Sequence, residues 1–230
     1  MSMTLRSILS AVLGEGGFLV PTSFVGSTSP DDEQMVYLAN RAAAFIREKQ
    51  FQRLRARYTV TLTAATTYAL PSDYLEIIPD TMMIVGRVDA VRFPTRADFW
   101  AYLQSTSGPS GFTVNARILG DLINVYSPTV GSVLAFEYVS NKPIMSVDGS
   151  TRLQRFANDL DTWLLDDDLL ILETKWRWKK AKGMPDWQAD EAECANYRLS
   201  VRGRDAGSQT ISGTPIVYNG EPYANLWVTP

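Results

Sequence analysis

Residues 29–63 read SPDDEQMVYLANRAAAFIREKQFQRLRARYTVTLT, and the change of pattern inside this stretch decides the fold class. In its first part, Met35, Leu38 and Ala42 recur at the spacing of an amphipathic helix. From residue 57 onward apolar and polar side chains alternate strictly, which is typical of a half-buried antiparallel strand. The stretch therefore predicts a helix followed by a strand, so we expect an α+β chain.

The ends of this first helix carry the expected signals. Ser29 is placed to cap the helix, and Pro30 suits its first position. Acidic residues follow at 31–33, and Arg47 and Lys49 stand at the opposite end, as the helix dipole favours. We expect the helix to run to about residue 50 or a little beyond.

Strand signals continue to residue 143. We predict strands at residues 83–88 and 134–138, a hairpin at residues 118–123 and a short helix at residues 94–103. In the hairpin, we expect Gly120 and Asp121 to take the positive φ angles of a two-residue turn.

Helical spacing returns after Pro143. The apolar residues that would share one helix face are Leu153, Phe156, Leu160 and Trp163 or Leu164. A further helix is predicted from the aspartates at 166–168 to a lysine-rich end, with Gly183 and Pro185 as its stop.

A last helix is predicted after Asp186, which is placed to cap it. Trp187, Cys194 and Val201 recur every seven residues on one face of this helix. The simplest arrangement is an antiparallel pair of helices joined by residues 183–185. Cys194 is then a packed core thiol, because nucleophilic use would need a base and the chain has no histidine.

The order of these signals predicts the domain organisation. We expect a helical scaffold with long helices near its N- and C-terminal parts, an inserted small antiparallel β unit and an extended C-terminal tail. The predicted segments are residues 1–28 (short helix and linker), 29–54 with 144–204 (helical domain), 55–143 (inserted β-rich domain) and 205–230 (C-terminal arm).

The composition excludes most catalytic chemistry. The 230 residues include no histidine and one cysteine, which excludes Ser-His-Asp and Cys-His catalysis and histidine-ligated zinc. The net charge of −3 lacks the basic signature of a DNA-coating protein. No apolar run reaches the ~20 residues of a membrane helix, and the N-terminal segment does not resemble a signal peptide. We expect a soluble, unsecreted protein with no catalytic residue, metal or cofactor.

An acidic cluster is the feature that could support an enzyme. It consists of Asp159, Asp161, Asp166, Asp167 and Asp168, followed by Glu173. Converging carboxylates can hold Mg²⁺ for a hydrolase or nuclease. However, acids at a helix start are also what the helix dipole favours, and adjacent helical residues such as Asp167 and Asp168 point about 100° apart.

A basic run with interleaved tryptophans ends the same predicted helix. Its cations are Lys175, Arg177, Lys179, Lys180 and Lys182, with Trp176 and Trp178 between them. The run could line a DNA channel, or it could be a solvated helix face with the aromatic residues buried on the other side.

The segment from residue 205 onward is punctuated by glycine and proline and has no helical period. Such a segment normally frays unless something holds it. We expect it to be an arm that docks on a partner subunit. The residues expected to make this contact are Ile216, Tyr218, Pro222, Tyr223, Leu226 and Trp227.

Three stretches, at residues 68–74, 136–143 and 167–187, resemble the head-to-tail adaptor, or head-completion, proteins of tailed bacteriophages, including collar proteins similar to tail tubular protein A. Residues 68–74, YALPSDY, look like the element that leads into the β unit of that group. Residues 136–143, FEYVSNKP, are similar to the aromatic strand with a proline exit that closes the unit. Residues 167–187 resemble the long helix with its Lys-x-Gly turn and the start of the last helix. The resemblance spans most of residues 30–205.

The resemblance implies a structural component of the virion at the head-tail interface, which assembles in the host cytoplasm. It implies a homo-oligomeric ring, usually of twelve subunits, below the portal protein, and a terminal arm that commonly reaches the portal. Such a ring extends the DNA channel, helps to retain packaged DNA and docks the tail, nozzle or tail-terminator protein. A mildly acidic protein suits a channel through which double-stranded DNA passes transiently, and the resemblance implies no membrane partner.

Two other functions stay open. The first is a Mg²⁺-dependent hydrolase or nuclease that uses the acidic region at residues 159–168. The second is a β-sandwich module that binds a carbohydrate or a protein through surface tryptophan and tyrosine side chains.

Overall fold

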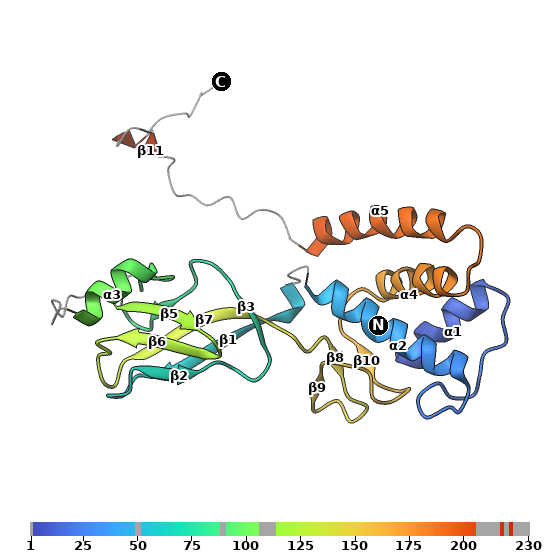
Figure 1. Ribbon diagram of the computed structural model, residues 1–230, viewed down its shortest axis with the longest axis horizontal. Helices are drawn as coiled ribbons and strands as arrows, with labels where there is room; N and C mark the ends of the chain where they lie inside the picture. The colour runs from blue at the N-terminus through green and yellow to red at the C-terminus, as the bar shows by residue number, and fades with distance from the viewer. Residues whose placement is uncertain are drawn as a thin grey trace, which may run out of the picture.

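The computed structural model describes residues 2–48, 52–87, 91–105 and 114–205, and the short paired strands β11 (Val217–Tyr218) and β12 (Glu221–Pro222). Two halves lie side by side along the longest axis of the molecule (Figure 1). We call the described residues of 2–48 and 144–205 the helical half, and those of 55–140 the β half. Helices and small antiparallel sheets are both present, so the chain is α+β, as predicted.

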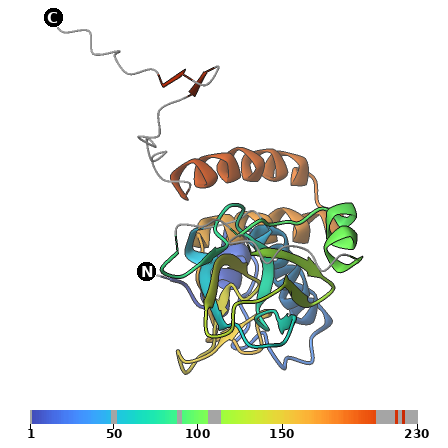
Figure 2. The same cartoon turned by 90° about the vertical axis from the view of Figure 1, so that its left-hand side faces the viewer.

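Four helices build the helical half within these described ranges: α1 (Leu5–Glu15), α2 (Pro30–Arg47), α4 (Asp167–Ala181) and α5 (Trp187–Asp205). Helix α4 packs against each of the other three, and α5 lies along the outer edge of this half, beside α4 (Figure 2). The apolar face predicted for α2 and the apolar face of α1 are buried in one core. None of the helices in these ranges is long and apolar enough to cross a bilayer.

Helices α4 and α5 form the predicted antiparallel pair, and residues 183–185 connect them. Gly183 takes φ +65°, a conformation that favours glycine, and the backbone N–H of Met184 donates to the carbonyl of Lys179 at 3.0 Å. These contacts close the last turn of α4 and reverse the chain.

The start and end of α2 differ from the prediction. The Ser29 side chain makes no capping hydrogen bond, although Ser29 occupies the capping position. The hydroxyl of Ser27 instead donates to Asp32 Oδ2 at 2.6 Å and accepts from the backbone N–H of Ser29 at 3.1 Å. Ser27 therefore organises this helix start, and α2 ends at Arg47 rather than near residue 50.

The helix predicted after Pro143 is absent, and this prediction is wrong. Three two-residue strands, β8 (Ile144–Met145), β9 (Arg152–Leu153) and β10 (Thr162–Trp163), pair in the order β10–β8–β9. The buried carboxylate of Asp161 accepts hydrogen bonds from the backbone N–H groups of Val147, Ala157 and Asn158. This side chain binds amides that a helix would have used, so it favours turns over the helix.

The β half contains two antiparallel sheets. In the first, β7 (Val133–Ser140) pairs with β1 (Arg55–Thr61), β3 (Tyr74–Ile77) and β4 (Met83–Ile84). In the second, the order is β2 (Thr67–Ala69), β6 (Leu122–Tyr126) and β5 (Asn115–Leu119). One apolar cluster joins the sheets, with Ile123 and Val125 from the second and Leu134 and Phe136 from the first. Helix α3 (Ala97–Ser105) lies at the far end of this half (Figure 1).

Most predicted elements of the β half are observed with shifted bounds. The exposure of side chains along β1 alternates as predicted, and the short helix begins at Ala97 instead of residue 94. Of the strand predicted at 83–88, only β4 forms before a turn at Gly86, and residue 88 lies outside the described ranges. The hairpin is present, but only Gly120 takes a positive φ, so the prediction for Asp121 is wrong. A single left-handed residue at the first turn position is sufficient when that residue is glycine.

The chain crosses between the halves twice, between Arg47 and Arg55 and between Ser140 and Ile144. The 3₁₀ turn η1 (Gln52–Leu54) lies on the first crossing. Arg47 Nη1 donates to the carbonyl of Asn141 at 3.2 Å, so the end of α2 is fastened to the second crossing. Both crossings are therefore held at the junction of the two halves.

Candidate interaction surfaces

The lysine and arginine side chains of the basic run contact neighbouring helices. Lys175 Nζ lies 2.7 Å from Glu15 Oε2 and 3.3 Å from Asp190 Oδ1, and Lys179 Nζ lies 2.5 Å from Asp190 Oδ2. Burial acts to lower the pKa of Lys175, but the two carboxylates more than offset it and raise this pKa above its ordinary value. These lysines thus link α4 to α1 and α5.

A fully buried carboxylate, Glu173, organises the middle of the same interface. Arg177 and Arg198 both form ion pairs with it, and Trp176 Nε1 donates to it at 2.8 Å. The Arg177 guanidinium also lies 5.2 Å from the ring centroid of Phe45. Burial lowers the pKa of Arg177 to about 10, so this side chain stays charged at neutral pH.

The other two cations of the run also have partners within the chain. Lys182 Nζ lies 2.5 Å from Asp31 Oδ1, and Lys180 Nζ lies 4.2 Å from the ring centroid of Trp187. Each of the five cations of the run therefore has a partner within the chain. Contact with DNA stays a prediction for all five cations.

The acidic side chains that could have formed a Mg²⁺ site are directed to separate places. Asp159 accepts hydrogen bonds from the backbone N–H groups of Phe24 and Val25 at 3.0 and 2.8 Å. Asp166 caps α4 by accepting from the Leu169 N–H at 2.9 Å, and Asp167 accepts from the Met3 N–H at 3.0 Å. Across the described ranges, no three acidic or cysteine side chains are placed to hold a metal ion. The hydrolase alternative therefore has no convergent site among these carboxylates.

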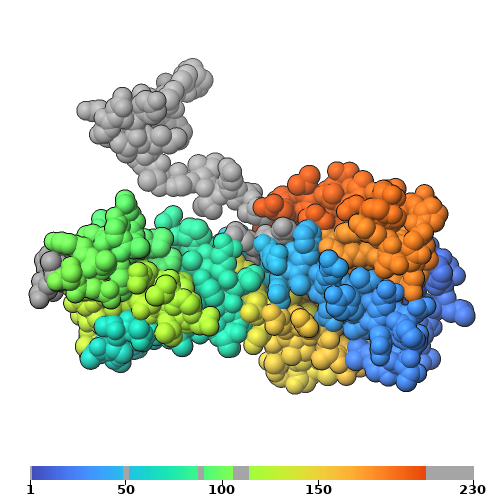
Figure 3. All heavy atoms as spheres, in the orientation of Figure 1, coloured from blue at the N-terminus to red at the C-terminus, as the bar shows by residue number. Residues whose placement is uncertain are grey.

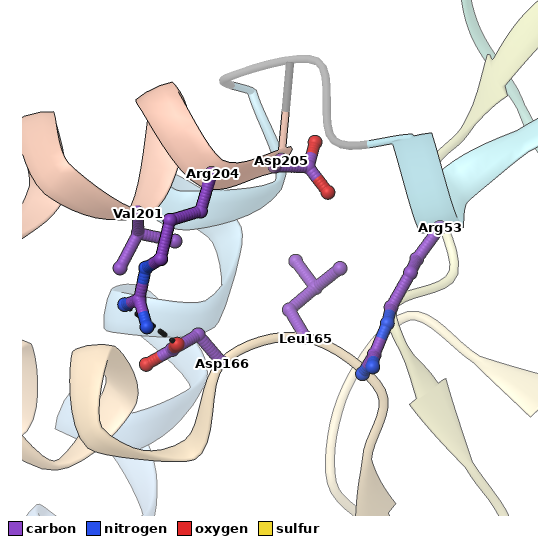
Figure 4. Close-up of a pocket in the computed structure, with 6 residues that line it drawn as sticks. All are labelled: Arg53, Leu165, Asp166, Val201, Arg204 and Asp205. Atoms are coloured by element: carbon purple, nitrogen blue, oxygen red, sulfur yellow. Dashed lines mark ion pairs between the residues drawn. The ribbon is translucent and has the colours of Figure 1, made fainter. Parts of the chain in front are cut away.

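A small cavity of about 220 Å³ lies at the junction of the two halves, where α5 ends (Figure 4). Arg53 lies on one side of it, and Arg204 reaches toward Asp166 on the other at 3.5 Å (Figure 4). The Asp205 carboxylate accepts from the backbone N–H of Gln52 at 2.7 Å. These contacts fix the position from which the C-terminal segment leaves the helical half.

A larger groove of about 460 Å³ runs along the outer face of α2. Its walls are α2, the segment at Phe24–Gly26 and the residues that follow β9, and we call it the α2 groove. Figure 3 shows the surface of α2, in blue, beside the yellow surface of the β8–β9 region. Its lining residues are Phe24, Val25, Gly26, Glu33, Val36, Tyr37, Asn40, Arg41, Ala44, Arg47, Gln154 and Arg155.

The lining of the α2 groove combines apolar surface with positive charge. Tyr37 is 64% exposed. Arg41, Arg47 and Arg155 line the groove against one carboxylate, Glu33. The Nε of Arg47 is buried and has no hydrogen-bond partner, and burial lowers the pKa of this residue. The groove is therefore suited to an apolar segment that carries hydrogen-bond acceptors and little positive charge.

An apolar loop follows α1. Phe18, Leu19 and Val20 are consecutive and are 43%, 97% and 44% exposed. Consecutive exposed apolar residues are unusual on a monomer surface and mark contact sites.

The β half gives less support to a module that binds through surface tryptophan. Trp100 is the only tryptophan of residues 55–143, and it is 4% exposed. Arg117 lies over its ring at 4.6 Å from the centroid. Tyr102 on α3 is exposed.

Two further predictions concern Cys194 and the C-terminal arm. Cys194 is fully buried and burial raises its pKa, so the core assignment is confirmed. Ile216, Tyr223, Leu226 and Trp227 lie outside the described residues, and only the backbone of Tyr218 and Pro222 is described, in β11 and β12. The arm contacts therefore stay predictions.

The α2 groove is the surface that sequence reasoning missed. A signal for it is present in residues 29–63, because Val36 and Tyr37 lie beside the predicted buried stripe of the helix. The opposite wall comes from residues 24–26 and 154–155, and no local pattern indicates that these segments lie beside α2.

Comparison with protein families gives a match over nearly all of the chain. The family model described as SU10 adaptor protein matches residues 3–211. This range includes both halves and extends just beyond the end of α5. Comparison with curated proteins gives no match.

Proposed function

Because the chain belongs to the SU10 adaptor protein family, we propose that it is a structural adaptor in the virion of a tailed phage. The family match over residues 3–211 is the observation that carries this proposal. The resemblance of residues 68–74, 136–143 and 167–187 to head-to-tail adaptors supports the same role.

The adaptor acts as a homo-oligomeric ring of about twelve copies below the portal protein. A ring needs head-to-tail contacts between two different surfaces of each copy. The exposed loop at Phe18, Leu19 and Val20 and the α2 groove are distinct surfaces that offer apolar area for such contacts.

The ring extends the DNA channel, helps to retain packaged DNA and presents a docking surface for the tail, nozzle or tail-terminator protein. The net charge of −3 suits a conduit, because DNA must slide through it without tight binding. Four of the five cations at residues 175–182 bind acids of their own chain, and Lys180 lies over the Trp187 ring, which limits their availability to phosphates. The role requires no catalytic residue, and we propose that the protein is not an enzyme.

Mass photometry and negative-stain microscopy of the full chain, alone and with the portal protein of the same phage, test the proposal. We expect a closed ring whose mass is about twelve times the 25.6 kDa of one copy. A monomer under both conditions would contradict the adaptor role. The variant Asp167→Asn/Asp168→Asn should still assemble, whereas loss of a Mg²⁺-dependent nuclease activity in it would favour the enzyme.

A further inference from the structure

We propose that the α2 groove of one copy binds the C-terminal segment of the neighbouring copy, through residues 216–228. This inference rests on the proposed ring and names the contact that joins one subunit to the next.

The charges of the two partners are complementary. The groove carries Arg41, Arg47 and Arg155 against Glu33. Residues 206–230 contain one charged side chain, Glu221, and no lysine or arginine. The segment therefore brings one negative charge and no positive charge to a groove with an excess of arginine.

The apolar parts of the two partners are complementary as well. Val25, Val36, Tyr37 and Ala44 contribute apolar surface to the groove. The apolar and aromatic residues of the segment are concentrated at residues 216–228, after a region rich in small polar residues. The segment also presents backbone carbonyls, which can accept from the arginine side chains that line the groove.

The length of chain between α5 and this apolar region permits a contact with a neighbouring copy. Asp205 is bonded to Gln52, and Gln52 lies only five residues after Arg47 at the end of the groove. Residues 206–215 carry no charge and can extend to ~33 Å at ~3.3 Å per residue. This reach is comparable to the ~26 Å that twice the radius of gyration of a 100-residue domain gives. The segment is therefore long enough to cross a subunit boundary.

Disulfide cross-linking between two full-length variants tests the contact directly. One variant carries Gln154→Cys at the rim of the groove, and the other carries Tyr223→Cys in the segment. Because Cys194 is fully buried, the introduced thiols are the ones available to react. We expect a disulfide-linked dimer containing one copy of each variant when the two are mixed before assembly, and no cross-link in either variant alone.

A chain that carries both substitutions distinguishes the source of the segment. A contact between neighbours gives a ladder of linked copies on a non-reducing gel. A disulfide within one chain would overturn the proposal, because it would identify the segment as the copy's own. A ring that forms without any cross-link, including one in which Tyr223→Cys links only to the portal protein, would overturn it and leave the proposed function intact. Absence of a ring from the full chain would overturn both.

Substitutions in the groove provide a second measurement. We expect Tyr37→Ala and Arg155→Glu each to raise the concentration needed for half-assembly about tenfold. Tyr102→Ala and Arg202→Glu remove similarly exposed side chains outside the groove and serve as matched controls. Equal effects in groove variants and controls would contradict the proposal. A chain truncated after Gly207 should keep its helical circular dichroism and its thermal transition but fail to assemble, and normal assembly of that chain would also overturn the proposal.

Discussion

The sheets of the β half and the outermost helix of the helical half, α5, are held by different kinds of contact. In the β half, residues from both sheets, such as Ile123 and Phe136, form a compact apolar cluster. In the helical half, α5 buries only Asp190, Cys194 and Val201, and much of its attachment to α4 comes from ion pairs of Asp190 and Glu173. The outermost helix is thus held largely by charge, although α1, α2 and α4 share an apolar core.

This difference separates stability from specificity. Apolar burial is non-directional and tolerates changes of shape that conserve volume. A buried ion pair contributes little net stability, but it is costly to break on one side because a desolvated charge is left without a partner. We infer that the β core provides stability to its half, whereas the charged contacts fix where α5 lies and hence where the C-terminal segment begins.

The largest expected effect is in the apolar core of the β half. Phe136 is 1% exposed and packs against Tyr58 at 5.3 Å between ring centroids. We expect Phe136→Ala to lower the free energy of unfolding of this half by about 4 kcal/mol through lost burial and a cavity. Hydrogen exchange of the β7 backbone amides at increasing urea measures it, because these amides belong to the β half alone, whereas five of the six tryptophans lie outside residues 55–143. A parallel loss of helical circular dichroism at the same urea concentration would show that the halves unfold as one unit and would remove the comparison.

The next effect concerns the charged interface of α5. We expect Glu173→Gln to destabilise the helical half by about 3 kcal/mol, because Arg177 and Arg198 lose their shared carboxylate inside the protein. Helical circular dichroism during thermal unfolding measures it. Asp98→Asn is the matched control, since it removes a carboxylate from the exposed pair with Arg96. A variant as stable as the control would mean that α5 does not depend on charge.

A third effect is pH-dependent and tests whether the β half also relies on a charge. Asp73 accepts hydrogen bonds from Tyr138 at 2.8 Å and from Ser140 at 2.7 Å. Burial acts to raise the pKa of Asp73, but these bonds more than offset it, so the pKa lies below its ordinary value. Burial and the bond to Asp73 raise the pKa of Tyr138 to about 12.

The direction in which stability changes with pH follows from the lowered pKa of Asp73. Its contribution is fully present above the unfolded pKa of about 3.9 and is lost as the pH falls through the lower folded value. We expect Asp73→Asn to cost the β half about 1–2 kcal/mol at pH 7 and to reduce the loss of stability as the pH falls below about 3.9. Urea denaturation at pH 7 and pH 3, followed by hydrogen exchange of the β7 amides, measures both, and an unchanged difference between the two pH values would contradict the assignment.

The smallest effect is expected at the rim of the helical half. The pair of Lys182 with Asp31 is partly exposed, with 73% of the Asp31 side chain accessible. We expect Lys182→Ala to change the free energy of unfolding by about 0.5 kcal/mol or less. A loss as large as that of Glu173→Gln in thermal unfolding would show that burial does not decide the strength of these ion pairs.

Local patterns predicted the elements whose burial is periodic. The stripes of α2 and β1 were predictable because each repeats over several turns or pairs, and the end of α4 was predictable from Gly183. The prediction for residues 144–164 failed because Phe156 and Trp163 are buried at a helical spacing by coincidence. The buried carboxylate of Asp161 accepts hydrogen bonds from the local backbone there. One aspartate in a sequence does not by itself indicate that role.

The interaction surfaces were less predictable because their partners are distant in the sequence. Lys175 binds Glu15 and Lys182 binds Asp31, so the basic run is spread among contacts with other helices. The α2 groove likewise needs residues 24–26 and 154–155 beside one helix. Only the tertiary arrangement brings these groups together.

The pairing of Arg55 with Val139 places the entry and the exit of the β half on adjacent strands. Adjacent antiparallel strands lie ~4.8 Å apart, so the two crossings begin next to each other. A β unit of different size could therefore be grafted between these two positions while α2 and β8 keep their places. This layout separates a unit whose size can change from the helices, whose packing does not depend on that size.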